Sequence, residues 1–137
     1  MGNSTTFLTI PAAQRTGTQI VHAEREIDFS VENLAASSTM DVLKLPKGAV
    51  PLQAGWITKT VNTDDSAKLA VGVATASLAI VSAAVLGAAN SVVITPLTAS
   101  KVLTADDTLR ITGSVATLAQ AKVVVFCEYI VSDACRN

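Results

Sequence analysis

The residues of this sequence that could take part in catalysis are few. The single histidine, His22, stands beside Glu24 and Arg25. A nucleophile–histidine–acid arrangement needs a rigidly placed histidine, and nothing around His22 resembles a nucleophile elbow. The two cysteines, Cys127 and Cys135, cannot complete a structural zinc site with one histidine, because such a site takes four ligands of these kinds. The sequence therefore predicts that the protein is not an enzyme and binds neither a metal nor a cofactor.

Two short segments place a pair of aspartates where oxygen ligands could gather. Thr63–Gly72 ("TDDSAKLAVG") resembles Ala105–Gly113 ("ADDTLRITG"), and in both a hydroxyl residue and a short apolar run follow the aspartates. Paired carboxylates are suitable ligands for Ca²⁺, but no third oxygen-rich segment repeats the spacing of a known calcium loop. Asp, Ser and Thr side chains also close turns onto the backbone. We therefore expect these aspartates to stabilise turns.

Composition excludes several classes of function. The chain has 137 residues, which suits one domain, and ten Lys and Arg balance eleven Asp and Glu. No chain-wide basic field is available for nucleic acid. Apolar residues make up 50% but aromatic residues only 4%, so the apolar mass is Ala, Val, Leu and Ile, which suit closely packed sheets. Two cysteines make no secreted disulfide framework, and we expect Cys127 to be a small buried apolar residue in a reducing compartment.

The first 23 residues differ from the rest of the chain. They have weak periodicity and many Thr and Ser residues, with an apolar patch at Phe7, Leu8 and Ile10. The segment lacks the basic and apolar regions of a secretory signal. We expect residues 1–23 to form an extended arm that could dock on a neighbour, and residues 24–137 to form the folded domain.

A long uncharged stretch dominates the middle of the chain. Leu69–Ser100 contains 32 residues without one charged side chain. Its hydropathy is in the range of a transmembrane helix, but Gly72, Gly87 and Pro96 divide it into short pieces and no Trp or Tyr flanks it. We favour the interior of a folded domain over a membrane span. Within the stretch, residues 76–88 are rich in Ala and could form a short helix or a strand.

Several other segments have the alternating pattern of strands. Lys122–Val131 is apolar on both faces, which predicts a central position in a sheet. The further strand candidates are Glu26–Glu32, Met40–Gly48, Ala49–Asn62 and Ser91–Thr95. Seven or eight short strands, with turn signals about every eight to twelve residues, are typical of a two-sheet sandwich or jelly roll. The sequence thus predicts an all-β fold of this kind.

Three of these segments resemble a known family. Met40–Gly72 ("MDVLKLPKGAVPLQAGWITKTVNTDDSAKLAVG"), Thr108–Gly113 ("TLRITG") and Lys122–Val131 ("KVVVFCEYIV") resemble strands of small virion proteins encoded beside the major capsid gene in tailed bacteriophages. The resemblance implies a capsid decoration, or cement, protein with a jelly-roll fold. Such a protein binds the outside of an icosahedral shell and bridges neighbouring copies of the major capsid protein. It assembles in the cytoplasm of the bacterial host and has no nucleic-acid or membrane partner.

This resemblance also directs attention to the residues that could anchor an interface. Large apolar and aromatic side chains dominate interface energies, so we expect anchors at Phe7, Leu8, Ile10 and Trp56. A short arm readily makes a reciprocal contact, which favours a homodimer, with a homotrimer as the alternative. Other functions compatible with the sequence are another phage particle module (a head fibre base or tail component), a carbohydrate-binding sandwich and a single-span membrane protein.

Overall fold

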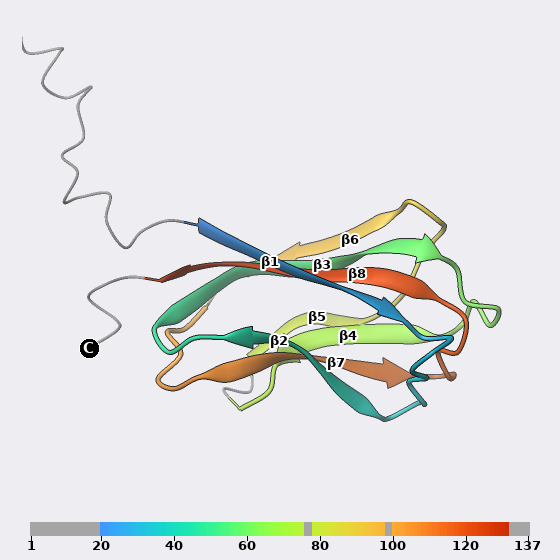
Figure 1. Cartoon of the computed structure of the whole chain (residues 1–137), viewed down its shortest axis with the longest axis horizontal. Helices are drawn as coiled ribbons and strands as arrows, with labels where there is room; N and C mark the ends of the chain where they lie inside the picture. The colour runs from blue at the N-terminus through green and yellow to red at the C-terminus, as the bar shows by residue number, and fades with distance from the viewer. Residues whose placement is uncertain (1–19, 76–77, 98–99, 132–137) are drawn as a thin grey trace, which may run out of the picture.

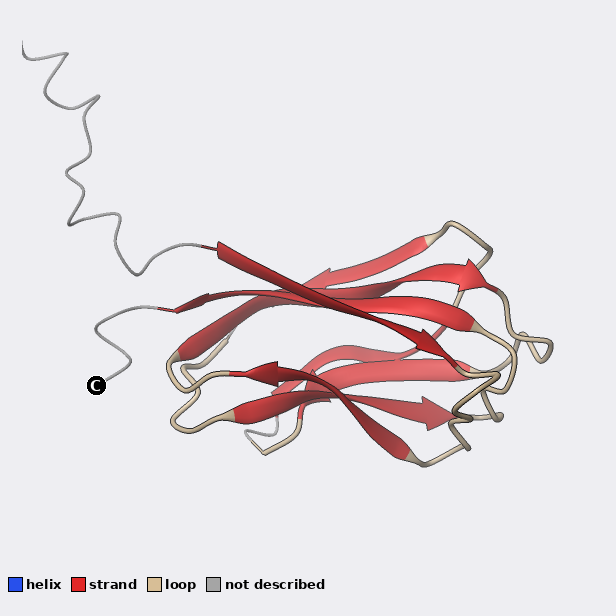
Figure 2. Ribbon diagram, in the orientation of Figure 1, coloured by secondary structure: helices blue, strands red, loops and turns tan. Residues whose placement is uncertain are grey.

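The described part of the chain folds into eight strands that form two facing sheets (Figure 1). The computed structural model describes residues 20–75, 78–97 and 100–131. No helix occurs among these residues, as Figure 2 shows, and hence none that is long and apolar enough to cross a membrane. The strands are β1 (Ile20–Asp28), β2 (Thr39–Leu45), β3 (Ala49–Thr60), β4 (Lys68–Val73), β5 (Leu78–Val85), β6 (Val92–Pro96), β7 (Asp107–Ser114) and β8 (Lys122–Val131).

Each sheet has four antiparallel strands, with the order β1-β8-β3-β6 in the first sheet and β2-β7-β4-β5 in the second. Strands that are consecutive in sequence often lie in different sheets, so that β8 inserts between β1 and β3, and β7 inserts between β2 and β4. This arrangement is a jelly roll. The predicted all-β jelly-roll sandwich is confirmed.

The core lies between the two sheets and follows the alternation of each strand. In β7, Leu109 and Ile111 are fully buried while Arg110 between them is partly exposed. The largest fully buried side chain is that of Trp56 in β3, which touches no solvent. The indole N–H of Trp56 donates to the backbone oxygen of Leu86 at 3.2 Å. Trp56 is thus a core residue of this chain, and its expected role as a surface anchor is wrong, because no part of the side chain reaches the surface.

Strand β8 occupies the central position predicted from its two apolar faces. It pairs with β1 on one side and with β3 on the other. Val123 and Val125 point into the core, whereas Val124 and Phe126 point away from it but are still only 8% and 7% exposed.

The uncharged stretch forms strands, including the region where a helix was an alternative. Residues 78–85 are strand β5, which pairs with β4. Two register shifts in this pairing let the consecutive residues Ile80 and Val81 both turn inward. Helix propensity is a weak preference, and here the backbone hydrogen bonds to β4 together with the burial of two β-branched side chains override it. The possible helix at residues 76–88 is therefore wrong for the described part of that segment.

Glycine at position 55 lets β6 lie close to β3. A Cβ atom at Gly55 would lie 1.8 Å from the backbone oxygen of Val93 in β6. No side chain fits into that space, since the atom in the way belongs to the backbone of a paired strand. Gly55 therefore determines how closely β6, the last strand of the first sheet, lies to β3.

The first strand differs in its limits from the predicted one. β1 begins at Ile20, so it includes four residues of the expected arm, and it ends at Asp28. The carboxylate of Asp28 accepts hydrogen bonds from the backbone N–H and the hydroxyl of Ser30, which turn the chain. Val31 is consequently 82% exposed instead of facing the core. Phe7, Leu8 and Ile10 lie outside the described residues.

Candidate interaction surface

His22 is part of a surface cluster on β1 and β8. Its Nε2 atom lies 2.9 Å from Glu24, and its Nδ1 atom lies 3.3 Å from Glu128 on the neighbouring strand. Its ring stacks on Phe126 with 5.8 Å between ring centroids. Gln53 on β3 donates to the other oxygen of Glu128, so the cluster crosses three strands. None of the cluster members is a serine, threonine or cysteine that His22 could activate as a nucleophile. The contacts of His22 hold its ring in place on the surface.

The carboxylates around His22 predict a raised pKa. The hydrogen bond to Glu24 is the main cause, and the hydrogen bond to Glu128 adds to it. Because the pKa of His22 is higher in the folded state than in the unfolded chain, the cluster contributes its full stabilisation at pH values below the ordinary pKa of histidine. This stabilisation is lost as the pH rises through the pKa of His22 in the folded state. An NMR titration of the imidazole protons should therefore give a pKa above 6.5. Glu24→Gln should move it back toward that value.

A matched control for this titration is Glu32→Gln, which removes an exposed carboxylate beyond the far end of β1. It should leave the His22 pKa unchanged. An unshifted wild-type value, or an equal effect of both variants, would contradict the cluster.

Cys127 is unsuited to nucleophilic chemistry. Its side chain is fully buried in the core between the sheets. Burial, with a smaller contribution from the charge of Glu128, raises the pKa of the thiol to about 12. The thiolate is the reactive form of cysteine, so this thiol stays protonated and inert at neutral pH. The prediction of a small buried apolar residue is confirmed.

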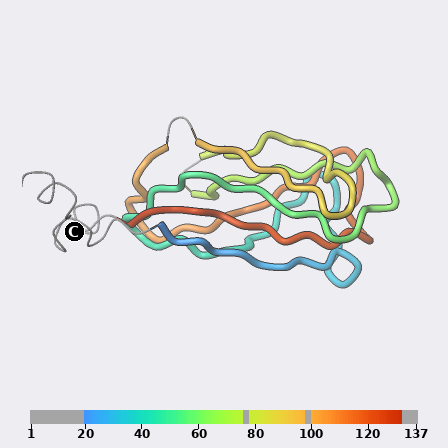
Figure 3. Tube along the Cα trace, turned by 90° about the horizontal axis from the view of Figure 1, so that it is seen from above, coloured from blue at the N-terminus to red at the C-terminus, as the bar shows by residue number. Residues whose placement is uncertain are grey.

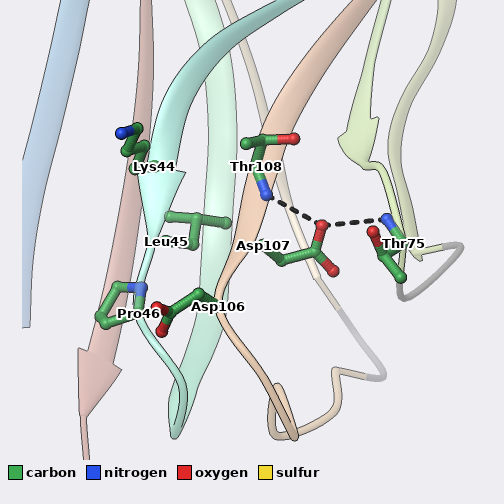
Figure 4. Close-up of a pocket in the computed structure, with 7 residues that line it drawn as sticks. All are labelled: Lys44, Leu45, Pro46, Thr75, Asp106, Asp107 and Thr108. Atoms are coloured by element: carbon green, nitrogen blue, oxygen red, sulfur yellow. Dashed lines mark hydrogen bonds between the residues drawn. The ribbon is translucent and has the colours of Figure 1, made fainter.

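A pocket opens at the end of the second sheet, where the β2–β3 and β4–β5 connections meet the start of β7 (Figure 4). Asp107 accepts hydrogen bonds from the backbone N–H groups of Thr75, at 2.9 Å, and Thr108, at 2.8 Å. Asp106 accepts the backbone N–H of Lys47 at 2.9 Å. In Figure 4 the side chain of Lys44 points away from both carboxylates. The two aspartates thus join loops that are distant in sequence.

The other aspartate pair closes a local turn. Asp64 accepts hydrogen bonds from the backbone N–H and the hydroxyl of Ser66, and these bonds hold the pKa of Asp64 below its ordinary value. Turn stabilisation is therefore confirmed for Asp64. Among the described residues, no three His, Cys, Asp or Glu side chains lie close enough together to hold a metal ion.

The most distinctive surface is the side of the first sheet that faces away from the second sheet, which we call the outer face. Register places its side chains in rows across the four strands. One row contains Glu24, Phe126, Gly55 and Ile94, and the next contains Glu26, Val124, Ile57 and Val92. Each row begins with a carboxylate on β1 and ends with an exposed apolar side chain on β6.

Charge and apolar area are thus separated on the outer face. Glu26 lies 3.5 Å from Lys59 and 3.8 Å from Lys122, so its charge is paired with cations on β3 and β8. On β6, Val92 is 54% exposed and Ile94 is 48% exposed. Such an arrangement offers hydrogen-bonding and charged groups beside an apolar patch, which suits binding to another macromolecule.

None of the anchors expected from the sequence marks this surface. Its signal was present in Lys122–Val131, where both faces are apolar, although only one of them can face the core of a two-layer sandwich. Val124 and Phe126 are the outward members of that strand. Of the four expected anchors, Trp56 is buried and the other three lie outside the described residues.

Comparison with known proteins shows similarity in fold. No protein-family model matches the sequence, and no curated protein sequence matches it. A chain in the capsid asymmetric unit of cyanophage Pam1 superposes with a TM-score of 0.66 at 19% identity, over 85% of this chain and 87% of that chain. A chain in the capsid of Ralstonia phage GP4 gives 0.65 at 15% identity, over 90% and 89%.

A third similar chain is part of the acid-stable capsid structure of the Helicobacter pylori bacteriophage KHP30. It gives a TM-score of 0.57 at 13% identity, over 85% of this chain and 90% of that chain. Each alignment includes nearly all of both chains, so the shared unit is the whole jelly roll. The chain is therefore a jelly-roll protein with the fold of chains found in three phage capsid structures.

Proposed function

We propose that this chain is a structural virion protein that binds the outer surface of an icosahedral phage capsid and cements neighbouring major capsid subunits. The observation that carries the proposal is the likeness to chains in phage capsid structures, with TM-scores of 0.57 to 0.66 over 85–90% of this chain. Those chains are covered to 87–90%, so they too are small jelly rolls rather than domains of large proteins.

Cementing requires contact surfaces and no reactive group. An interface of about 1,000 Å² contributes modestly for each copy, but an icosahedral shell repeats it many times. The outer face supplies exposed apolar groups at Val92 and Ile94 beside paired charges. The nearly neutral chain, with a net charge of −1, suits contact with a protein shell better than contact with packaged DNA.

In this proposal the chain is placed on the capsid exterior during assembly in the host cytoplasm, with the major capsid protein as its partner. The segment that precedes β1 reaches a neighbouring subunit and binds through Phe7, Leu8 and Ile10. Copies of the chain associate with one another, as a dimer in the favoured form.

Particles of the phage that encodes the chain provide the test. We expect quantitative mass spectrometry to find it in numbers comparable to the major capsid protein. Particles that lack it should release DNA at lower temperature, and adding the purified chain should restore their resistance. A few copies for each particle would instead indicate a head fibre base or a tail component. Absence from particles would overturn the proposal.

The contribution of the arm can be measured separately. A variant with Phe7→Ser, Leu8→Ser and Ile10→Ser should bind capsids at least about 100-fold more weakly, since each buried apolar side chain contributes about 1–2 kcal/mol. Its circular dichroism spectrum should not change, because these residues precede β1. Thr6→Ser with Thr9→Ser is the matched control and should bind normally. Equal occupancy of both variants would remove the arm from the proposal.

A further inference from the structure

We infer that the side of the sandwich formed by β5 and β6, which we call the uncharged side, is an interface with a second copy of this chain related by a two-fold axis. The inference does not depend on capsid binding. Self-association then uses this side of the sandwich, whereas the sequence pattern favours a reciprocal contact through the N-terminal arm.

The uncharged side consists of the last strand of each sheet. β6 ends the first sheet and β5 ends the second, and the two strands are in contact. Figure 3 shows them along one long side of the molecule, with β1 and β2 along the opposite side. Among the described residues, no segment pairs with the free edge of β5 or β6. Their free backbone N–H and C=O groups can therefore form hydrogen bonds with another chain.

The two long sides differ completely in charge. Both edge strands of the uncharged side lie within Leu69–Ser100, which has no charged residue. The opposite side has six charged residues in its two strands: Glu24, Arg25, Glu26 and Asp28 in β1, and Asp41 and Lys44 in β2.

Charge is one way in which folded proteins protect their edge strands from pairing. Arg25 in addition reaches from β1 to the backbone oxygens of Asp41 and Val42, at 3.5 and 3.4 Å, and so covers the gap between β1 and β2. One side of the sandwich is therefore protected against pairing, and the uncharged side is not.

Several properties of the uncharged side favour a second copy as the partner. At a two-fold interface, a strand near the axis lies against the same strand of the second copy. Any charged residue on that strand would therefore face a residue of like charge. The side chains exposed on β5 include Ala79, Ser82 and Ala83, which are neutral and small enough for two backbones to approach closely. A partner chosen by charge would instead require complementary charges, and β5 and β6 have none.

The uncharged side also exposes an apolar group, since Val85 at the end of β5 is 48% exposed. Val92 and Ile94 point to the outer face, so pairing of β6 with the β6 strand of a second copy would bring two copies of this apolar strip together and leave them open to the capsid. Pairing of the β5 and β6 edges with those of a second copy would extend both sheets across the axis.

The test is the mass of the purified full chain in solution, measured by light scattering during size-exclusion chromatography. At about 100 µM, above the dissociation constants of weak specific interfaces, we expect twice the 14.1 kDa of one chain. Ala83→Lys places like charges against each other across the axis and should shift the chain to the mass of a monomer. Its circular dichroism spectrum should be unchanged, since Ala83 is exposed.

Two control variants make the result specific. Thr39→Lys adds the same charge to an exposed position on β2, on the opposite side, and should leave the dimer intact. Ala83→Ser changes the same position without charge and should also leave it intact. A monomeric wild-type chain, a trimer, or a dimer that survives Ala83→Lys would overturn the inference. So would a dimer that is lost only in the Phe7, Leu8 and Ile10 variant. Capsid occupancy is measured separately, so the two proposals can fail independently.

Discussion

Replacing Trp56 with alanine should lower the free energy of unfolding by about 3–5 kcal/mol. The indole is completely buried between the sheets, so its removal leaves a cavity that the surrounding strands can fill only in part. The variant also loses the hydrogen bond to the backbone oxygen of Leu86. Urea unfolding followed by circular dichroism measures the change. Such a loss is a large part of the stability of a domain of this size, which is about 5–15 kcal/mol.

A conservative variant keeps the experiment informative if the alanine variant does not fold. Trp56→Phe retains a ring in the core and loses the N–H donor, and Leu86 still accepts the hydroxyl hydrogen of Thr58 at 2.7 Å. We expect a loss of about 1–2 kcal/mol for this change. A loss below about 1 kcal/mol for the alanine variant would show that the indole is not part of the core.

The second large effect is expected at Asn62, which joins two connections at one end of the sandwich. Its side chain is only 6% exposed. Its Oδ1 atom accepts the backbone N–H groups of Ala119 and Gln120 at 3.1 and 3.2 Å. Its Nδ2 atom donates to the backbone oxygens of Asp64 and Thr117 at 3.0 and 3.2 Å. One amide thus satisfies four backbone groups of the β3–β4 and β7–β8 connections.

Asn62→Ala should therefore lower the free energy of unfolding by about 2–4 kcal/mol, because four partly buried backbone groups lose their partner. Hydrogen exchange of the Ala119 and Gln120 amides should accelerate, since Asn62 accepts both. Asn62→Asp keeps the acceptor but places a carboxylate oxygen against the two backbone oxygens to which the amide donates, so it should also destabilise the fold. Gln120→Ala removes one long, exposed hydrogen bond to Thr63 and should change stability by less than about 1 kcal/mol. An equal effect at both positions would contradict the role of Asn62.

Much of the fold could be predicted from strand patterns. Lys122–Val131 is apolar on both faces, and β8 is indeed a central strand with exactly these bounds. The segments around Trp56 and Ile111 were also placed in strands, because alternation reports directly which residues can share a face. Gly48, the last residue of the candidate Met40–Gly48, has a φ of 86° in the turn between β2 and β3. These features depend only on residues that are close together in the sequence.

The interaction surface was less predictable. A strand residue that points away from the core cannot be distinguished by sequence from one that faces it when both faces are apolar, as for Val124 and Phe126. The lone Trp56 could be an interface anchor or a core residue, and only its pairing opposite the core residue Val125 decided for the core. Asp107 was expected to close its own turn, but it binds the backbone of Thr75, which is 32 residues away.

The sequence by itself determined that this chain is an all-β sandwich, because strand alternation and turn residues are local properties. Only the tertiary structure decided which strands are neighbours. That pairing made β5 a strand, since hydrogen bonds to β4 outweigh the helix propensity of its alanines. It also gathered the uncharged stretch on one side and the charged strands β1 and β2 on the other, because long-range pairing sets which strands lie at the edges.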